Sequence, residues 1–195
     1  MTSSISFRDF SYLVRSDLYR HGGATGLRAF LLKLLVDPGY QCTFWMRAAA
    51  WLSAHRVLRF GLSQIVRLVL RHYSLKYCIS IPWRTRIGAG FYIGHFGQII
   101  VHDRSVIGRN CNISQGVTIG QANRGPRKGH SIVGDNVYIG PGAKIVGSVR
   151  IGNNVAIGAN CVVTKDVPDN AVVAGVPGRV ISYEGSRDYV NWTDY

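Results

Sequence analysis

An aliphatic residue followed by a small one returns every six positions in the stretch Ile81 to Val163. The register is unbroken over the second half of this stretch, from Val133 onward. A period of six fits neither the 3.6-residue turn of an α-helix nor the two-residue alternation of an isolated strand. It therefore describes a larger repeating unit, which we interpret as a stack of β-helix coils with short parallel strands around an aliphatic column.

The repeat is interrupted at two places. After the register that ends at Ile99, the aliphatic positions shift by two residues and continue from Val101. The next step, from Ile119 to Val133, is fourteen residues, which is two repeats plus two extra positions. Repeat scaffolds usually carry function where the period breaks, so we take these interruptions as the leading site. They fall beside three histidines: His95, His102 and His130.

Composition restricts the class of protein. The 195 residues are 47% hydrophobic, which excludes a disordered chain and allows a sizeable core. The formal net charge is +13, and residues 1–79 alone hold eleven Lys and Arg against three Asp and Glu. Such a surplus favours a phosphate-bearing partner: an anionic cofactor, an anionic membrane or a nucleic acid. Nucleic acid is the weakest of these, because no recognised binding motif accompanies the charge.

The cysteines and the N-terminus bear on location. The four cysteines are scattered without a CxxC pair, so we expect buried free thiols in a reducing cytoplasm and no zinc knuckle or disulfide framework. The first residues show no secretory signal, and no stretch reaches the length of an apolar spanning helix. We expect a cytoplasmic protein, and contact with the inner face of the membrane is the alternative that the basic N-terminal region allows.

Residues 1–79 read as a helical region. Helices are predicted over 1–22, 25–36, 40–55 and 57–73, with Gly-rich or Pro-containing breaks between them. The fourth carries a stripe of arginines: Arg56, Arg59, Arg67 and Arg71. This stripe fits docking on an anionic membrane, or a cap helix that packs on the β-helix or a sister subunit and leaves its arginines in solvent.

The region 80–181 is the predicted β-helix domain, and 182–195 is a C-terminal tail. The exposed strand edges at the two ends of the stack must be covered. We expect the N-terminal helices to cover one end and the segment after Val172 to cover the other. The segment 121–131 has no aliphatic beat and three basic residues, so it must loop out, either as a solvated insertion or as a lid over a bound anion.

Three features together carry a family resemblance: the hexapeptide repeats, the looped insertion, and the run Val163–Asn170 followed by Ala174–Arg179. Over about residues 17–181 the chain resembles hexapeptide-repeat acyltransferases. Within that group it looks closest to the serine acetyltransferase-like enzymes of bacterial polysaccharide gene clusters, including colanic acid acetyltransferases. The resemblance implies a mainly β fold, a left-handed parallel β-helix with an N-terminal helical cap. It also implies acetyl-CoA as co-substrate, no metal, and a homotrimer with the active site between neighbouring prisms.

The resemblance also assigns roles to individual positions. His95 matches the catalytic histidine, which would remove the proton from an acceptor hydroxyl, and imidazole suits this role near neutral pH. His130 matches a second histidine that follows the insertion and faces the acceptor. Four further positions match contacts to CoA, and the two cationic ones suit its phosphates: Ala159, Thr164, Lys165 and Arg179.

Two departures from serine acetyltransferases affect the expected acceptor. Ser80 stands where those enzymes place a carboxylate that orients the catalytic histidine, and a serine lacks the same electrostatic support. The C-terminus also lacks the isoleucine by which they dock onto a partner synthase. We therefore expect O-acetylation of a sugar, polysaccharide or lipid-linked oligosaccharide, with serine acetylation for cysteine biosynthesis as the alternative.

Two alternatives of other kinds remain. A γ-type carbonic anhydrase shares the left-handed β-helix and binds zinc between subunits through three histidines, a role that His95, His102 and His130 could fill. The spacing argues against it, because that family pairs two ligands five positions apart late in the prism, and this chain has no such pair of histidines there. A non-catalytic, membrane-associated trimeric scaffold is the other alternative, but it leaves the motif around Thr164 and Lys165 without a purpose.

Overall fold

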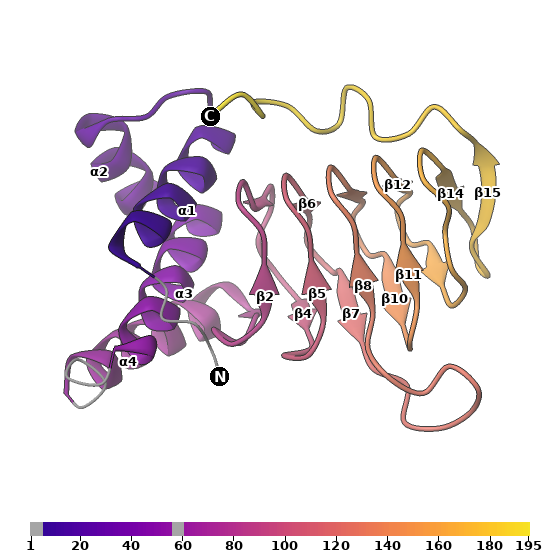
Figure 1. Ribbon diagram of the computed structural model, residues 1–195, viewed down its shortest axis with the longest axis horizontal. Helices are drawn as coiled ribbons and strands as arrows, with labels where there is room; N and C mark the ends of the chain where they lie inside the picture. The colour runs from indigo at the N-terminus through magenta and orange to yellow at the C-terminus, as the bar shows by residue number, and fades with distance from the viewer. Residues whose placement is uncertain (1–5, 56–60) are drawn as a thin grey trace.

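The computed structural model describes residues 6–55 and 61–195. Four helices form a cap at one end of a long prism of short strands, and the C-terminal segment returns along the prism toward the cap (Figure 1). No helix in the described ranges is long and apolar enough to cross a membrane. The helices are α1 (Phe7–Arg20), α2 (Leu27–Val36), α3 (Pro38–Ala54) and α4 (Leu62–Tyr77).

Local sequence signals fix the helix ends. The Ser6 hydroxyl accepts from the backbone N–H of Asp9, and the Asp9 carboxylate accepts from the backbone N–H of Ser6, a capping box that starts α1. The Asp37 carboxylate accepts from the backbone N–H of Tyr40 and caps α3, with Pro38 in the first turn. Helix α3 therefore begins before the predicted residue 40, and α4 continues to Tyr77 rather than ending near 73.

The arginine stripe predicted on the fourth helix is only partly described. Arg56 and Arg59 lie outside the described residues. Arg71 is exposed, whereas the Arg67 guanidinium carbon lies 4.5 Å from the centre of the Trp83 ring. Arg67 therefore packs against the first turn of the prism and is not part of a solvated stripe.

The strands form three sheets, parallel except for the last strand. Sheet A contains β1 (Ile79–Ser80), β4 (Ile99–Val101), β7 (Thr118–Gly120), β10 (Lys144–Val146) and β13 (Val162–Val163). Sheet B contains β2 (Arg86–Ile87), β5 (Val106–Ile107), β8 (Ile132–Val133) and β11 (Arg150–Ile151). Sheet C contains β3 (Tyr92–Ile93), β6 (Asn112–Ile113), β9 (Tyr138–Ile139), β12 (Ala156–Ile157), β14 (Val172–Ala174) and β15 (Arg179–Ser182).

The pairing register explains the six-residue beat and its interruptions. Lys144 lies opposite Val162, eighteen positions later, so a regular coil is three hexapeptides, one for each sheet. Ser80 lies opposite Ile100, twenty positions later. The two extra residues are absorbed in β4, where Ile99 and Val101 are both buried and Ile100 is exposed. The slip in the sequence is therefore a longer strand and not a break in the prism.

The aliphatic column predicted from the repeat is the core of the prism. Its inward-facing residues are almost completely removed from solvent, and each contributes about 1.5 to 3 kcal/mol relative to an exposed side chain. The largest are Ile99, Ile113, Ile119, Ile139, Ile145 and Ile157, none more than 1% exposed. Cys42, Cys111 and Cys161 are buried free thiols as expected, but Cys78 is exposed. Burial raises the pKa of the Cys42 thiol to about 12.

Asparagines form a ladder along the corner between sheets B and C. Each adopts positive φ, between 54° and 60°, a conformation that asparagine tolerates better than most residues. Each side-chain amide donates to the side-chain oxygen of the next, at 3.0 to 3.1 Å. The ladder consists of Asn110, Asn136, Asn154 and Asn170. It gives four successive corners of the prism the same geometry.

A buried ion pair joins the helical cap to the first coil. The Arg47 guanidinium on α3 bonds both carboxylate oxygens of Asp17 on α1, at 2.9 and 3.2 Å. It also donates to the backbone oxygens of Ile87 and Gly88, each at 2.6 Å. The Asp17 carboxylate accepts from the backbone N–H of Phe91 at 2.8 Å. Two helices and the first coil thus share one fully hydrogen-bonded charge pair.

The C-terminal segment departs from the expected end cap. Strand β15 pairs antiparallel with β14 at the far end, and the following residues then run back along the prism to the cap (Figure 1). The Tyr189 ring stacks on Tyr138 of sheet C with centroids 4.5 Å apart, and the Tyr195 hydroxyl donates to the Asn110 side chain. Only the β14–β15 part covers the end, and the rest covers a side of the prism.

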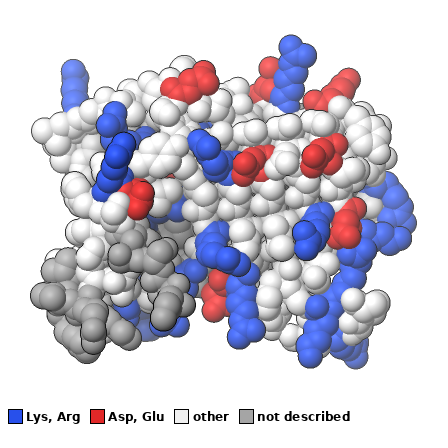
Figure 2. Space-filling view, in the orientation of Figure 1, with Lys and Arg blue, Asp and Glu red and all other residues white. Residues whose placement is uncertain are grey.

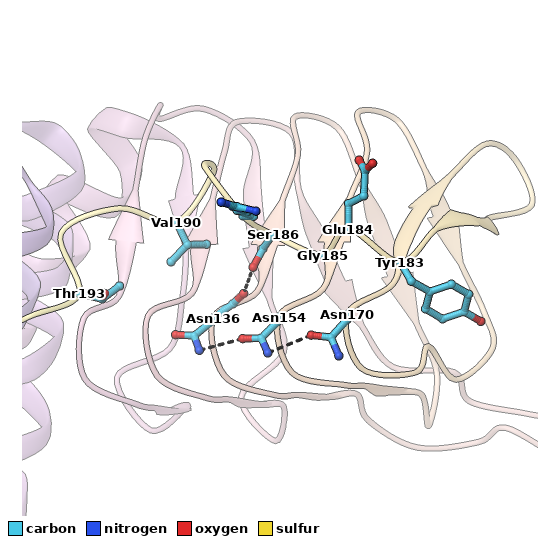
Figure 3. A pocket seen from close by; sticks show the side chains of 10 residues that line it. Asn136, Asn154, Asn170, Tyr183, Glu184, Gly185, Ser186, Val190 and Thr193 are labelled. Carbon is cyan, nitrogen blue, oxygen red and sulfur yellow. Dashed lines mark hydrogen bonds between the residues drawn. The ribbon is translucent and has the colours of Figure 1, made fainter.

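A hollow of 390 Å³ lies between this returning segment and the asparagine ladder. Figure 3 shows Asn136, Asn154 and Asn170 in a row beneath the segment, with Ser186 reaching back to the ladder. The Ser186 hydroxyl donates to the backbone oxygen of Asn136. None of the predicted site residues lines this hollow.

Candidate active site

The candidate histidines lie in turns at two corners of the prism. His95 connects β3 of sheet C to β4 of sheet A, whereas His102 connects β4 to β5 of sheet B. His130 ends the loop between β7 of sheet A and β8 of sheet B. The chain therefore brings His102 and His130 to the A/B corner and places His95 at the C/A corner, on the opposite edge of sheet A.

The His95 side chain is exposed. In the part of the chain that the structure describes, no group hydrogen-bonds its ring. Ser80 is also exposed and lies at the start of sheet A, in register with Ile100. An exposed imidazole can accept a proton from a bound hydroxyl, but no hydrogen bond within the described chain fixes its orientation.

His130 stacks on His102, a contact that the sequence analysis did not predict. The two rings have centroids 4.6 Å apart and an interplanar angle of 19°. The His102 Nδ1 atom lies 3.2 Å from the backbone N–H of Arg104, from which it accepts, and 3.2 Å from an Asp103 carboxylate oxygen. The contact could have been predicted by assigning each repeat to a coil, because both histidines occupy turns between sheets A and B in neighbouring coils.

The surroundings of His130 favour its neutral form. Its Nδ1 atom is buried and has no hydrogen-bond partner among the described residues. Partial desolvation, followed by the nearby His102 and Arg104, holds the pKa of the imidazole below its ordinary value, against a smaller opposing effect of Asp103. A neutral imidazole can accept a proton or orient a hydroxyl at neutral pH.

Replacing His102 with glutamine is expected to raise the pKa of His130. The substitution removes both the stacked ring that desolvates His130 and a group that repels its protonated form. Titration of the His130 ring signals by NMR measures the shift, with His72→Gln on α4 as the matched control. An unchanged pKa in the His102→Gln variant would contradict this account.

The basic loop 121–131 is anchored to the A/B corner. A backbone bridge between Ala122 and Gly129 closes it, and Figure 1 shows it protruding from the prism. The Arg127 guanidinium donates to the Asp166 carboxylate at 2.9 Å, and the same oxygen accepts from the backbone N–H of Arg150. The Arg150 bond and then the Arg127 guanidinium hold the pKa of Asp166 below its ordinary value. The loop is thus tied beside Lys165.

Replacing Asp166 with asparagine is expected to speed tryptic cleavage within the loop. The change removes the charge that Arg127 binds and frees a segment with three trypsin sites, Arg124, Arg127 and Lys128. The rate of cleavage at neutral pH, followed by mass spectrometry, measures the effect. Asp169→Asn is the control, because Asp169 accepts from the backbone at another corner. Equal cleavage rates in the two variants would show that the Arg127 contact does not hold the loop.

Three of the four predicted CoA contacts divide between the same two corners, and the fourth lies at the end of the prism. Ala159 lies in the C/A turn after β12, whereas Thr164 and Lys165 follow β13 at the A/B corner, and Arg179 begins β15. All four are exposed. On the face shown in Figure 2, basic side chains gather at the lower right, toward the end of the prism where the loop protrudes in Figure 1. These positions suit an anionic cofactor lying along the outside of the prism.

The described residues contain no group of three His, Cys, Asp or Glu side chains placed to hold a metal ion. His95 lies at a different corner from His102 and His130, so a single chain does not assemble the three histidines that a zinc site would use.

Comparison with known proteins identifies the family. Residues 130–165 match the family described as "Bacterial transferase hexapeptide (six repeats)". The serine acetyltransferase of Synechococcus elongatus is 38% identical over 155 residues, which cover 79% of this chain and 61% of the relative. The serine acetyltransferase of Bacillus pumilus is 35% identical over 160 residues, covering 82% of this chain and 71% of the relative. The chain thus spans about three fifths of the length of the Synechococcus protein.

Solved structures agree with these sequence matches. The Brucella abortus serine acetyltransferase in complex with coenzyme A superposes with a TM-score of 0.75 at 29% identity, covering 92% of this chain and 70% of that one. The Neisseria gonorrhoeae serine acetyltransferase in complex with serine gives a TM-score of 0.71 at 29% identity, over 92% and 72% of the two chains. The predicted resemblance to hexapeptide-repeat acyltransferases is confirmed, but these relatives are serine acetyltransferases and not polysaccharide enzymes. The chain belongs to the serine acetyltransferase family of hexapeptide-repeat proteins.

Proposed function

We propose that the protein transfers the acetyl group of acetyl-CoA to a hydroxyl acceptor, with His95 as general base. The observation that carries the proposal is the match to serine acetyltransferases over 82% of the chain. The acceptor hydroxyl gives its proton to the His95 imidazole as its oxygen attacks the thioester carbon. The C–S bond then breaks, and the CoA thiolate leaves and takes up the proton. Lys165 and Arg179 pair with the CoA phosphates.

Serine is the first candidate for the acceptor. The relatives reported above are serine acetyltransferases, and one solved relative is a complex with serine. This support reverses the preference for a saccharide that the sequence suggested. His130 at the A/B corner faces the acceptor in this proposal, with its neutral imidazole available to orient the substrate.

A saccharide hydroxyl is the second candidate, and one observation favours it. Ser80 occupies the position where the family resemblance places a carboxylate, and it is exposed at the first strand of sheet A. Incubation of the full chain with acetyl-CoA and equal concentrations of serine and simple sugars, followed by mass spectrometry of the products, distinguishes the two. O-acetylserine as the main product supports the first candidate, and acetylated sugar as the main product overturns it.

The active site in this proposal is shared between subunits of a trimer. His95 and His130 lie at opposite edges of sheet A, so two prisms packed side by side bring the C/A corner of one to the A/B corner of the next. The three parallel sheets and the hexapeptide match also support left-handed winding of the coils.

Mixing two inactive variants tests the shared site. His95→Ala and His130→Ala chains, unfolded together and reassembled, are expected to recover about a quarter of wild-type activity, because a random pairing of chains leaves that fraction of interfaces intact. Each variant reassembled alone is the control. If the mixture is no more active than the two variants alone, a site shared between subunits is wrong.

A further inference from the structure

A second cavity, separate from the candidate active site, lies between the helical cap and the first coils. We call this 780 Å³ space the cap cavity. One part of its wall is apolar and comes from α1 and sheet B: Phe10, Leu13, Ile87 and Val106. The other part is basic, with Arg47 of α3, Arg67 of α4, Arg84 just before β2 and Arg86 at the start of β2. Its volume is within the range of small-molecule sites in proteins.

The basic wall carries uncompensated positive charge. Arg47 is neutralised by Asp17, but no Asp or Glu among the described residues pairs with the other three arginines. The guanidinium carbons of Arg67 and Arg84 lie 4.5 and 4.8 Å from the centre of the same Trp83 ring. Two like charges are thus gathered on one indole. An anion bound beside them would offset their repulsion.

Arg67 also has unused hydrogen-bonding capacity. Its Nη2 atom donates to the Ser53 hydroxyl at 2.8 Å, but its Nε atom is buried and has no partner within the described ranges. A buried donor without a partner is costly, and an anionic oxygen is the acceptor that a guanidinium binds most strongly. Geometry and charge therefore indicate the same kind of group.

We propose that the cap cavity binds an amphipathic anion. The phosphate or carboxylate head lies among Arg67, Arg84 and Arg86, and the hydrocarbon body lies on the apolar wall. This site goes beyond the proposed acetyl transfer and does not depend on it. The cap cavity shares part of its wall with a neighbouring hollow of 570 Å³, which is also lined by Arg67, Trp83 and Arg84 and reaches His102 at the A/B corner. A bound anion would therefore lie next to the candidate acceptor side of the prism.

Isothermal titration calorimetry on the full chain tests the proposal. The probes are decyl phosphate and decanoate, both below their micelle concentrations. Decanol is the control without a charged head, and inorganic phosphate is the control without a hydrocarbon chain. Saturable binding of at least one anion is expected, at least about tenfold tighter than that of decanol or phosphate. The tighter of the two anions tells whether the head is a phosphate or a carboxylate.

Point variants locate the binding. Arg84→Gln is expected to weaken the tighter anion about ten- to a hundredfold, because a charge-assisted contact is lost. Arg84 is exposed and its replacement does not threaten folding. Arg150→Gln is the matched control, an exposed arginine at the other end of the same sheet, and it should bind as the wild type does. Absence of saturable binding, equal binding of decanol, or unchanged affinity in Arg84→Gln would each overturn the proposal.

Discussion

Replacing His95 with alanine is expected to lower the turnover number about 10² to 10⁴-fold, the usual contribution of a general base. The side chain is exposed, and no group in the described ranges hydrogen-bonds it, so the substitution should leave the melting temperature unchanged. Release of free CoA under saturating acetyl-CoA and acceptor measures the turnover number, and thermal unfolding measures the stability.

The matched control is His72→Ala, another exposed histidine, on α4 and outside every candidate site. It should keep wild-type turnover. If His95→Ala is equally active, His95 is not the base. If it loses activity together with several degrees of melting temperature, the loss reports structure and not proton transfer.

Replacing Arg47 with alanine is expected to lower the free energy of unfolding by about 3 to 5 kcal/mol, since it leaves the Asp17 carboxylate buried without its cation. It also removes the donors to the backbone oxygens of Ile87 and Gly88, which join the cap to the first coil. Chemical denaturation of the purified chain measures the change, provided that the transition is two-state.

Two further variants distinguish the loss of the buried charge pair from the loss of an arginine side chain in general. Arg150→Ala removes an exposed arginine and should change the free energy of unfolding by no more than about 0.5 kcal/mol. Arg47→Met combined with Asp17→Asn removes both charges and should recover part of the stability lost in Arg47→Ala. A loss in Arg47→Ala no larger than in Arg150→Ala would mean that the buried pair does not hold the cap.

The prism was predictable because its six-residue repeat is a local pattern in the sequence. Each aliphatic position of the beat points inward, and the observed core follows it from Ile87 to Val163. The shift after Ile99 marked a real feature, but only the pairing of strands shows that β4 absorbs it. The start of α3 was predicted two residues too late, at residue 40, although an aspartate before a proline is a strong N-terminal signal.

Features that depend on contacts between distant residues were not predictable in the same way. The returning C-terminal segment has no periodicity, and it is held by pairs such as Tyr189 with Tyr138. The stacking of His102 on His130 requires the two interruptions to be counted into coils before the corners can be assigned. The exposure of Cys78 follows from its place between the end of α4 and β1, which the expectation of buried thiols did not consider.

The most direct test of the account is CoA release by the purified full chain. With acetyl-CoA and serine, we expect free CoA to appear in step with O-acetylserine, and at a rate well above hydrolysis without an acceptor. The same assay with sugars ranks the second candidate. CoA release that no hydroxyl acceptor increases, among serine and a broad set of saccharides, would contradict the assignment of this chain as an O-acetyltransferase.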